Sequence, residues 1–279
     1  VSLSEHKGGR LICHYCGYTQ PLPKLCPKCG SKYILGFKAG TQQIEDKLKE
    51  LYPGVRTLRM DADTTRAKDS YEKILSAFSN GEADVLIGTQ MIVKGHDFPK
   101  VTLVGILAAD LSLNASDYRA GERTFQLLTQ AVGRAGRGAL PGEAVIQTYQ
   151  PDHYAITCAA AQDYKSFYEE EILYRELSGY PPAAHMLAVQ IYGKEEENVK
   201  QLAQRLTDVV KSNMDFLQIL GPTPANISKI NDIYRYVFYA KHAEYDTLVA
   251  VKDCVEETLR QWQPRQLSIQ FDFDPVNVL

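Results

Sequence analysis

The sequence predicts an α/β protein of more than one domain, with a small cysteine-rich module at its start. Three observations predict this class. The chain has 279 residues, more than one domain usually holds; strands alternate with helices over residues 33–150; and a different order of strands and helices follows residue 183. We expect a partial zinc ribbon, an α/β lobe whose mostly parallel sheet has helices on both faces, a linking helix and a C-terminal α+β domain, over residues 1–32, 33–150, 151–183 and 184–279.

The composition excludes several classes of protein. Lys and Arg number 31 against 34 Asp and Glu, and the formal charge of −3 excludes nucleic-acid binding through a globally basic surface. Hydrophobic residues at 44% and charged residues at 23% are typical of globular domains, not of disordered chains. Because no apolar run or signal peptide is recognisable, we expect a cytoplasmic protein without membrane contact. The first residue is Val1, so we expect a processed chain or part of a longer one.

Four of the six cysteines form two C-x-x-C pairs near the start of the chain. Cys13 and Cys16 are separated from Cys26 and Cys29 by nine residues, and a glycine follows each pair. In a cytosolic chain, such pairs more often hold zinc than form disulfides, because two thiolates in a tight turn reach one ion. The sequence therefore predicts a zinc ribbon with four cysteine ligands. The alternative is a redox C-x-x-C pair, which usually occurs once beside a βαβ unit.

The first 40 residues are locally basic. Six Lys or Arg side chains stand against one acidic residue, Glu5, so this stretch carries a local charge of +5. Such a surface either contacts phosphates or a protein partner, or is only a solvated face. The sequence alone leaves both alternatives open.

Residues 33–150 alternate between strand and helix patterns. Continuous apolar runs mark the strands, and apolar residues three or four positions apart mark the helices. Pro53-Gly54 and Asn80-Gly81 end two of the helices. We expect strands at 33–37, 55–60, 84–88, 101–107 and 143–148, and helices at 41–51, 71–78 and 120–131.

Two loops are rich in polar and charged side chains, and the first of them covers residues 88–99 and follows an expected strand. It carries a hydroxyl, an amide, an ammonium and a carboxylate group on Thr89, Gln90, Lys94 and Asp97. Ligands of open parallel sheets bind beyond the carboxyl ends of the strands. We therefore expect these side chains to border a ligand site.

The second loop covers residues 130–138 and follows an expected helix. Arg134 and Arg137 lie three residues apart and are flanked by glycines, which let the backbone approach closely. The planar guanidinium group matches phosphate oxygens with two hydrogen bonds, so the loop suits a polyphosphate. The alternative is a solvated helix end.

These two loops resemble motifs V and VI of superfamily 2 helicases, whose motif VI reads Q-x-x-G-R-x-x-R, as Gln130 to Arg137 do here. Together with residues 61–65 and the cysteine pairs, the chain resembles more narrowly the bacterial primosomal replication-restart DNA helicases over essentially its whole length. This resemblance implies that residues 33–150 are a RecA-like helicase lobe 2, which faces the nucleotide across a cleft between two lobes.

The resemblance also implies roles for the loop residues. Arg134 and Arg137 would reach the phosphates of ATP, with Arg137 as the arginine finger, and Gln130 would orient the nucleotide or a water molecule. Gly95 and Asp97 would line the same cleft.

A second group of loop residues would contact the DNA backbone or couple it to the nucleotide: Thr89, Gln90 and Lys94. The sequence contains neither G-x-x-x-x-G-K-[ST] nor D-E-x-H, so it lacks the lobe that holds the phosphate cradle and magnesium ligands. We therefore expect a C-terminal half of a helicase that uses ATP and Mg²⁺ when complete and is inactive alone.

The family carries four C-x-x-C pairs that bind two zinc ions in a nested arrangement, and this chain matches the last two pairs. The resemblance thus implies that Cys13, Cys16, Cys26 and Cys29 serve half-sites of two ions. We expect at most one zinc ion in this chain.

The C-terminal region changes its pattern. One helix is expected over residues 152–178, ended by Pro181-Pro182. Beyond it the order is strand, helix, strand, strand, helix, strand, which is typical of a ferredoxin-like (βαββαβ) domain. The expected elements are 187–192, 195–211, 217–220, 234–241, 244–262 and 267–273.

The strand at 234–241 interleaves aromatic residues with a cation. Alternation predicts that Tyr234, Tyr236 and Phe238 face the core while Arg235 and Tyr239 face outward. The alternative is an aromatic platform that binds single-stranded nucleic acid by stacking and phosphate contact. The helicase family implies partners for this domain: DNA forks and junctions, the acidic C-terminal tail of single-stranded DNA-binding protein, with Arg235 as a carboxylate partner, and other primosome proteins. We expect a monomer.

The resemblance therefore implies part of an ATP-dependent 3′-to-5′ DNA helicase that restarts stalled replication forks and initiates primosome assembly. The main alternative is a zinc-ribbon module that binds DNA or proteins without ATP, and a weaker one is a thiol redox protein. The Q-x-x-G-R-x-x-R loop favours the helicase, because a binding module has no need of two glycine-flanked arginines at a strand-end cleft.

Overall fold

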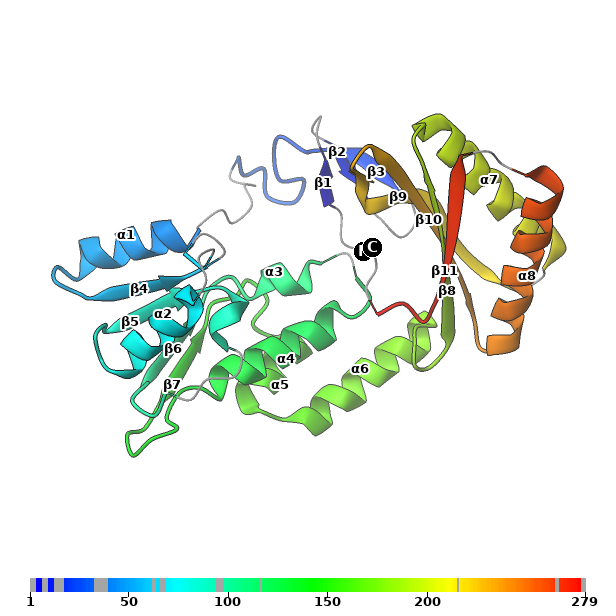
Figure 1. The fold of residues 1–279 in the computed structure, drawn as a ribbon. Helices are drawn as coiled ribbons and strands as arrows, with labels where there is room; N and C mark the ends of the chain where they lie inside the picture. Colours follow the sequence, from blue (N-terminus) through cyan, green and yellow to red (C-terminus); the bar gives the residue numbers. More distant parts are fainter. Residues whose placement is uncertain are drawn as a thin grey trace. The chain divides into compact units, whose positions relative to one another are not determined.

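A computed structural model describes residues 4–6, 10–12, 18–32, 40–61, 64–65, 69–93, 98–115, 117–214, 216–263 and 266–276. The chain divides into two compact units, each considered by itself (Figure 1). The parallel unit comprises Ser31–Leu113 and Glu122–Phe167, and the antiparallel unit comprises Val1–Gly30, Asn114–Gly121 and Tyr168–Leu279. The predicted strand at 33–37 lies outside the described residues.

The parallel unit is a mixed α/β structure with parallel strand pairs, as predicted. β4 pairs with β5 and β6 pairs with β7, both in parallel. Two short helices, η1 and α3, follow strands β5 and β6 and had no sequence signal. Along the chain the elements are α1 (Thr41–Leu51), β4 (Thr57–Met60), α2 (Ser70–Ser79), β5 (Val85–Gly88), η1 (Gln90–Val93), β6 (Leu103–Ile106), α3 (Asp110–Leu113), α4 (Ala120–Val132), β7 (Glu143–Ile146) and α5 (Tyr154–Ala161).

The core of the parallel unit forms where α4 and α5 meet the start of the next helix. Phe125 and Phe167 stack with ring centroids 4.0 Å apart and an interplanar angle of 10°. Leu128, Ile156 and Ala159 pack around the two rings and are almost completely buried. This core holds α4 in place, and α4 ends at the arginine loop.

The predicted linking helix is two helices, α5 and α6 (Tyr164–Ser178). α5 ends at Gln162, whose φ of 53° is left-handed and stops the helix. The carboxylate of Asp163 then accepts a hydrogen bond from the backbone N–H of Ser166 at 3.0 Å and caps the start of α6. The break was missed because a left-handed glutamine leaves no sequence signal of the kind that glycine gives.

The C-terminal part of the antiparallel unit has its elements in the predicted order: β8 (His185–Gly193), α7 (Glu196–Asn213), β9 (Gln218–Ile230), β10 (Ile233–His242), α8 (Tyr245–Trp262) and β11 (Leu267–Phe273). The strands form one sheet in the order β11-β8-β10-β9, and every neighbouring pair is antiparallel. β9 is much longer than the predicted strand at 217–220. The prediction ended there because Gly221-Pro222-Thr223-Pro224 is typical of a loop, but in the structure these residues lie within the strand. An edge strand tolerates proline, since its outer N–H groups need no partner strand.

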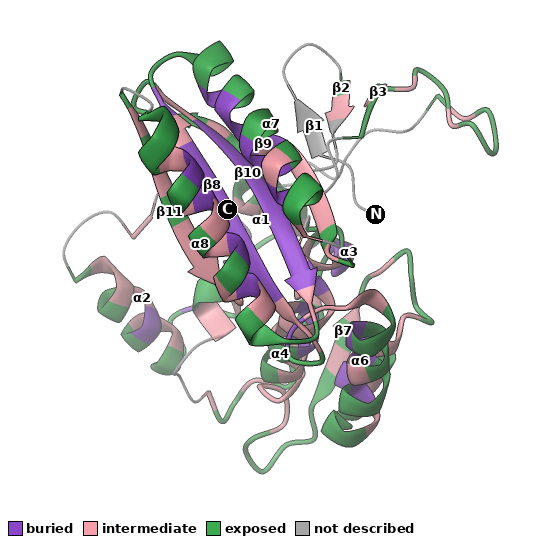
Figure 2. Ribbon diagram, turned by 90° about the vertical axis from the view of Figure 1, so that its right-hand side faces the viewer, coloured by how far each residue is buried: buried purple, intermediate pink, exposed green. Residues whose placement is uncertain are grey.

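Both faces of this sheet are covered, which Figure 2 shows as buried residues along β8 and β10. Helices α7 and α8 pack on one face, against Phe238 and its neighbours. On the other face Tyr239 is 1% exposed and lies in a cluster with Tyr118 and Tyr180. The prediction that Tyr239 faces solvent was therefore wrong. Alternation sends it to the correct face, but residues distant in the sequence bury that face.

The N-terminal segment contains a small antiparallel sheet that had not been predicted. Its strands are β1 (Ser4–His6), β2 (Arg10–Ile12) and β3 (Thr19–Pro21), in this order. Among the residues that the structure describes, no helix has the length and apolar character needed to cross a membrane.

Candidate functional site

The arginine loop leaves α4 through a tight, hydrogen-bonded turn. The backbone N–H groups of Gly133 and Arg134 donate to the carbonyls of Thr129 and Ala131, each at 3.0 Å. Gly136 follows with a left-handed φ of 70°, and its N–H donates to the carbonyl of Val101 at 3.0 Å. The loop is thus fixed at both ends, to its own helix and to the segment before β6.

Glycines in this loop and just after it sit where no side chain fits. A Cβ atom built on Gly142 would lie 2.0 Å from the backbone nitrogen of Gly136, and one on Gly138 would lie 2.0 Å from the carbonyl oxygen of Pro99. Backbone atoms cannot move aside as the end of a flexible side chain can. The close backbone approach expected from the glycines is therefore present, although it serves packing of the loop against its own unit.

We expect Gly142→Ala to lower the free energy of unfolding by about 1 to 2 kcal/mol, because the new methyl group forces the loop backbone apart. Gly105→Ala is the matched control, since a Cβ there meets no atom within 4 Å. Urea unfolding of both variants measures the difference. Equal stability of the two variants would contradict the close packing.

Arg134 joins the two predicted loops. Its half-buried guanidinium donates through Nη2 to the carbonyl oxygen of Val93 at 2.5 Å, and Val93 ends the turn η1 that follows β5. A hydrogen bond from a charged donor is among the stronger ones. The structure therefore brings the ends of the two loops together at the carboxyl side of β5, with Arg134 as the link.

Arg137 and Gln130 are both exposed. Arg137 Nε donates to the carbonyl oxygen of Gly133 at 2.6 Å, so the end of α4 orients the guanidinium group. Gln130 lies in the last turn of α4. Both side chains reach the surface of the parallel unit, whereas the guanidinium of Arg134 is half-buried and bonded to Val93.

The loop after β5 begins at a tightly packed strand end. Gly88 is paired with Met60 in the neighbouring strand, and a Cβ on Gly88 would lie 2.5 Å from the Met60 carbonyl oxygen. Thr89 and Gln90 follow and are exposed. Lys94, Gly95 and Asp97 lie outside the described residues. Of this loop's predicted ligands, the structure therefore places only the hydroxyl and the amide.

Sequence reasoning missed Asp110, a buried carboxylate just beyond β6. It accepts hydrogen bonds from the Thr148 hydroxyl at 2.7 Å and from the backbone N–H of Tyr149 at 2.9 Å. Burial disfavours its charged form, but these hydrogen bonds outweigh that effect and lower its pKa. The carboxylate thus ties the segments after β6 and β7 together. A single acid after an apolar strand is the only signal that the sequence offers.

The second cysteine pair forms a knuckle-like turn. Backbone N–H groups of Cys29 and Lys28 point at the sulfur of Cys26 and lower the pKa of its thiol, with Cys29 as the larger cause. Gly30 closes the turn with a φ of 68°, and its N–H donates to the Cys26 carbonyl at 2.8 Å. A thiol that is easily ionised suits a zinc ligand.

The structure places the thiols of Cys26 and Cys29 but not the full set of four, because Cys13 and Cys16 lie outside the described residues. Within the described part of the chain, no group of three or more His, Cys, Asp or Glu residues comes together around a possible metal site. Only the half-site of Cys26 and Cys29 is therefore seen to fit a metal.

Arg235 is only 9% exposed, so the prediction that it faces outward was wrong. Its guanidinium carbon lies 5.7 Å from the ring centroid of Tyr192, the residue opposite it on β8. Within the described residues its Nε, which is buried, has no hydrogen-bond partner. A role in binding a partner tail stays a prediction.

Models of three protein families match successive parts of the chain. The PriA DNA helicase Cys-rich region (CRR) domain matches residues 1–21, the helicase conserved C-terminal domain matches residues 22–139, and the primosomal protein N C-terminal domain matches residues 176–276. The arginine loop and the strand-end loop both lie within the helicase match. The sequence resemblance to helicases is thereby confirmed.

Curated relatives match over the length of the chain. Replication restart protein PriA of Bacillus subtilis (strain 168) is 43% identical over 99% of this chain and 34% of its own length. Its counterpart from Synechocystis sp. is 38% identical over 100% of this chain and 34% of its own length. The replication restart protein PriA of Chlamydia pneumoniae is 44% identical over 86% of this chain and 33% of its own length. The chain spans about a third of the length of these relatives. It belongs to the PriA family of replication restart proteins.

Proposed function

We propose that this chain supplies the second motor lobe, the cysteine-rich module and the C-terminal domain of an ATP-dependent 3′-to-5′ DNA helicase that restarts stalled replication forks and initiates primosome assembly. One observation carries the proposal: the Arg134 hydrogen bond to Val93 joins the two motif loops at the carboxyl end of a parallel strand, with Arg137 exposed beside them. This is where open parallel sheets bind ligands, and it supports a RecA-like lobe.

Arg134 and Arg137 have different roles in this proposal. ATP with Mg²⁺ would supply the phosphoryl group that is transferred to water. Arg137 would place positive charge on the transferred group, and Gln130 would orient the nucleotide or a water molecule, while Gly95 and Asp97 would line the cleft. Arg134 would contact the phosphates and also hold the loop after β5. Through that hydrogen bond, movement at the nucleotide would reach Thr89, Gln90 and Lys94, the proposed DNA contacts.

The decisive experiment joins this chain to the rest of the helicase. Mixed with a separately expressed N-terminal part, it is expected to restore DNA-stimulated ATP hydrolysis, whereas alone it should show negligible turnover. A robust rate from the chain alone would contradict the proposal.

The C-terminal domain is proposed to be ferredoxin-like. Its antiparallel sheet has its four strands in the order last, first, third, second along the chain, with both helices on one face, and this supports the assignment. Its proposed partners are DNA, the acidic tail of single-stranded DNA-binding protein and other primosome proteins. Arg235 can serve such a tail only if Tyr192 moves away, because the guanidinium is nearly buried.

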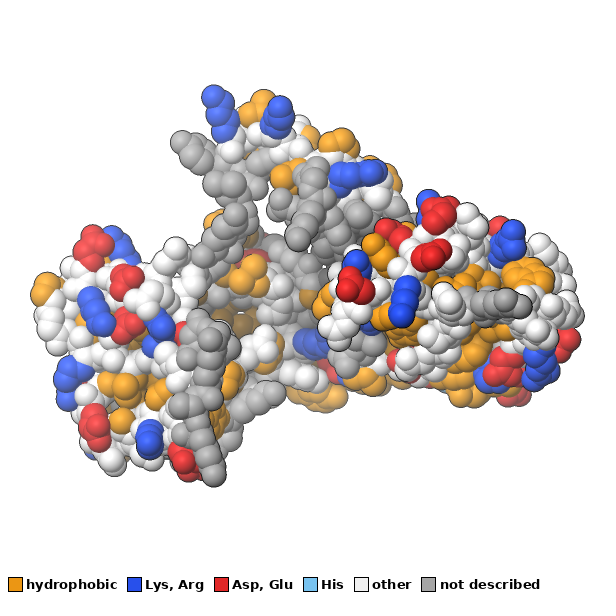
Figure 3. All heavy atoms as spheres, turned by 45° about the horizontal axis from the view of Figure 1, so that its top comes forward, with side chains coloured by type: hydrophobic (Ala, Val, Ile, Leu, Met, Phe, Trp, Pro, Cys, Tyr) orange, Lys and Arg blue, Asp and Glu red, His pale blue; other side chains and the backbone are white. Residues whose placement is uncertain are grey.

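A zinc-ribbon module that binds DNA or protein without ATP is the second candidate. It is favoured by the basic N-terminal segment, which has no acidic residue from His6 to Ile44. Among the described side chains at the top of the view in Figure 3, Lys and Arg are present and Asp and Glu are not. A chain that binds DNA but never restores ATP hydrolysis would support this alternative.

For zinc, we expect metal analysis of the isolated chain to find at most one ion per molecule. Cys26→Ser removes a thiolate whose pKa the backbone lowers, so it should reduce the bound zinc. Cys254→Ala is the control, because Cys254 lies in α8, 225 positions after Cys29 in the sequence. Two equivalents of zinc in the unchanged chain would refute the expectation, and an unchanged zinc content in Cys26→Ser would refute the ligand assignment.

A further inference from the structure

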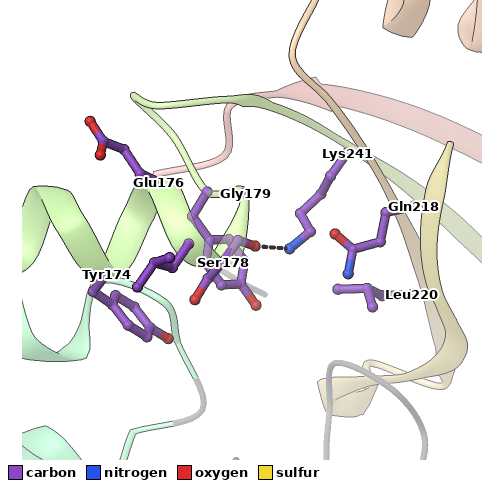
Figure 4. Close-up of a pocket in the computed structure, with 9 residues that line it drawn as sticks. Tyr174, Glu176, Ser178, Gly179, Gln218, Leu220 and Lys241 are labelled. Atoms are coloured by element: carbon purple, nitrogen blue, oxygen red, sulfur yellow. Dashed lines mark hydrogen bonds between the residues drawn. The ribbon is translucent and has the colours of Figure 1, made fainter. Parts of the chain in front are cut away.

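The antiparallel unit contains a cavity of about 570 Å³ that the helicase site does not involve. It lies where the end of α6 meets the start of β9 and the end of β10 (Figure 4). Its wall includes Tyr174, Leu177, Tyr180, Gln218, Leu220 and Lys241, all of the antiparallel unit. This volume is within the range of small-molecule sites.

Lys241 is the only cation among the residues that line this cavity. Its side chain is 5% exposed, and its Nζ donates to the carbonyl oxygen of Ser178 at 2.7 Å. The same Nζ lies 3.8 Å from the ring centroid of Tyr180. Both partners are uncharged, and Figure 4 shows the carboxylate of Glu176 directed away from Lys241. A buried ammonium group without a carboxylate is costly in free energy.

The cation belongs to a stacked column with charge at both ends. The rings of Tyr118 and Tyr180 stack at 5.0 Å with an interplanar angle of 6°. Arg175 lies 4.9 Å from the Tyr118 ring at one end, and Lys241 lies at the other end. The two ends differ, because Arg175 Nε also donates to the carboxylate of Glu171 at 2.7 Å. At the other end, the carboxylate in the cavity wall, that of Glu176, is directed away from Lys241 (Figure 4).

The rest of the cavity wall indicates what kind of anion fits. The Tyr174 side chain is 43% exposed and offers a ring to stack against, and the exposed amide of Gln218 points into the cavity beside Lys241. Aromatic rings beside cations bind nucleotides by stacking and phosphate contact, and an amide can hydrogen-bond the edge of a base. A flat ring with an edge-reading amide suits a base better than an aliphatic side chain.

We propose that this cavity binds a nucleoside phosphate, with the phosphate on Lys241 and the base against Tyr174 and Gln218. The ligand is either a free nucleotide or a nucleotide within a strand of DNA. The inference rests on the proposed function as a DNA helicase, since that supplies the strand. An acidic peptide is the competing occupant.

Titration of the full chain with dTMP, thymidine and a dye-labelled oligothymidylate tests this site. Lys241→Met should weaken dTMP binding about tenfold while leaving thymidine binding unchanged, and Tyr174→Ser should weaken both, because stacking contributes to both. Lys211→Met is the matched control, an exposed lysine on α7 that should have no effect. Circular dichroism confirms that each variant folds.

The outcomes separate the sources of the ligand. Weaker oligothymidylate binding in both variants identifies a strand, and an effect on dTMP alone identifies a free nucleotide. No binding of dTMP or oligothymidylate at about 1 mM, or binding of a tetra-aspartate peptide only, would overturn the proposal. The dTMP titration needs only this chain, whereas the helicase proposal is tested by ATP hydrolysis after mixing with the N-terminal part, so failure of the helicase proposal and failure of this one are distinguishable.

Discussion

Replacement of Arg137 by Ala in the complete helicase is expected to lower DNA-stimulated ATP hydrolysis by about 10³-fold or more. Its exposed guanidinium is oriented by the Gly133 carbonyl, to which Nε donates at 2.6 Å. Truncation therefore removes positive charge from the proposed phosphate site without opening a cavity. A steady-state ATPase assay with saturating DNA measures the effect, and the unfolding midpoint should change little.

Two further variants make this result specific. Arg137→Lys keeps the charge but loses the planar fork, so it should restore only part of the rate. Arg260→Ala removes an exposed arginine whose carboxylate partners are also at the surface of α8, and should leave the rate unchanged. An undiminished rate in Arg137→Ala would refute the arginine-finger assignment. An equal loss in Arg260→Ala would show that general charge, rather than this site, is responsible.

Arg134 illustrates how far the sequence predicts the site. The motif identifies both arginines and the strand-end loop, because the spacing of glycine and arginine is local information. The motif does not show which of the two arginines holds the strand-end loop and which is exposed. The hydrogen bond from Arg134 to Val93 connects residues 41 positions apart, and only the folded chain shows that one guanidinium is held while the other is exposed.

The fold was predicted most accurately where a short run of apolar residues indicates a buried strand. β5 is a continuous apolar run and β10 is a run of aromatic and aliphatic residues interrupted by Arg235, so the positions of both strands follow from the sequence. β9 was predicted too short, because Pro222 and Pro224 signal a loop locally while an edge position tolerates them. Tyr239 and Arg235 were expected to be exposed but are buried. The strand pattern does not show this burial, because the residues that cover these two side chains are distant in sequence.

Lys241 shows the same limit for binding sites. It lies in an aromatic strand and has no motif around it. Its surroundings come from Ser178 and Tyr180, about 60 positions earlier, so no local pattern predicts that the ammonium is buried. This burial has a measurable consequence for the whole antiparallel unit, because burial lowers the pKa of Lys241 from 10.5 to about 8.

The free energy of unfolding is therefore expected to rise with pH through the titration of Lys241. Below pH 8 the ammonium is charged in both states, and its burial destabilises the folded state. Between pH 8 and 10.5 the unfolded chain binds more protons than the folded one, so stability increases, by about 1 to 3 kcal/mol in total. Buried tyrosines act in the opposite direction above pH 10, because burial raises the pKa of Tyr236 to about 12.

Comparison with Lys241→Met isolates the lysine, because all other titrating groups are common to both proteins. We expect the variant's stability relative to the unchanged chain to fall steadily between pH 7.5 and 9.5, as the unchanged chain sheds its buried charge. Lys211→Met should show no such trend, since Lys211 is exposed. Urea unfolding across this pH range provides the measurement. A stability difference independent of pH would mean that the ammonium is hydrated in the folded state, and it would remove the electrostatic reason for an anion in the cavity.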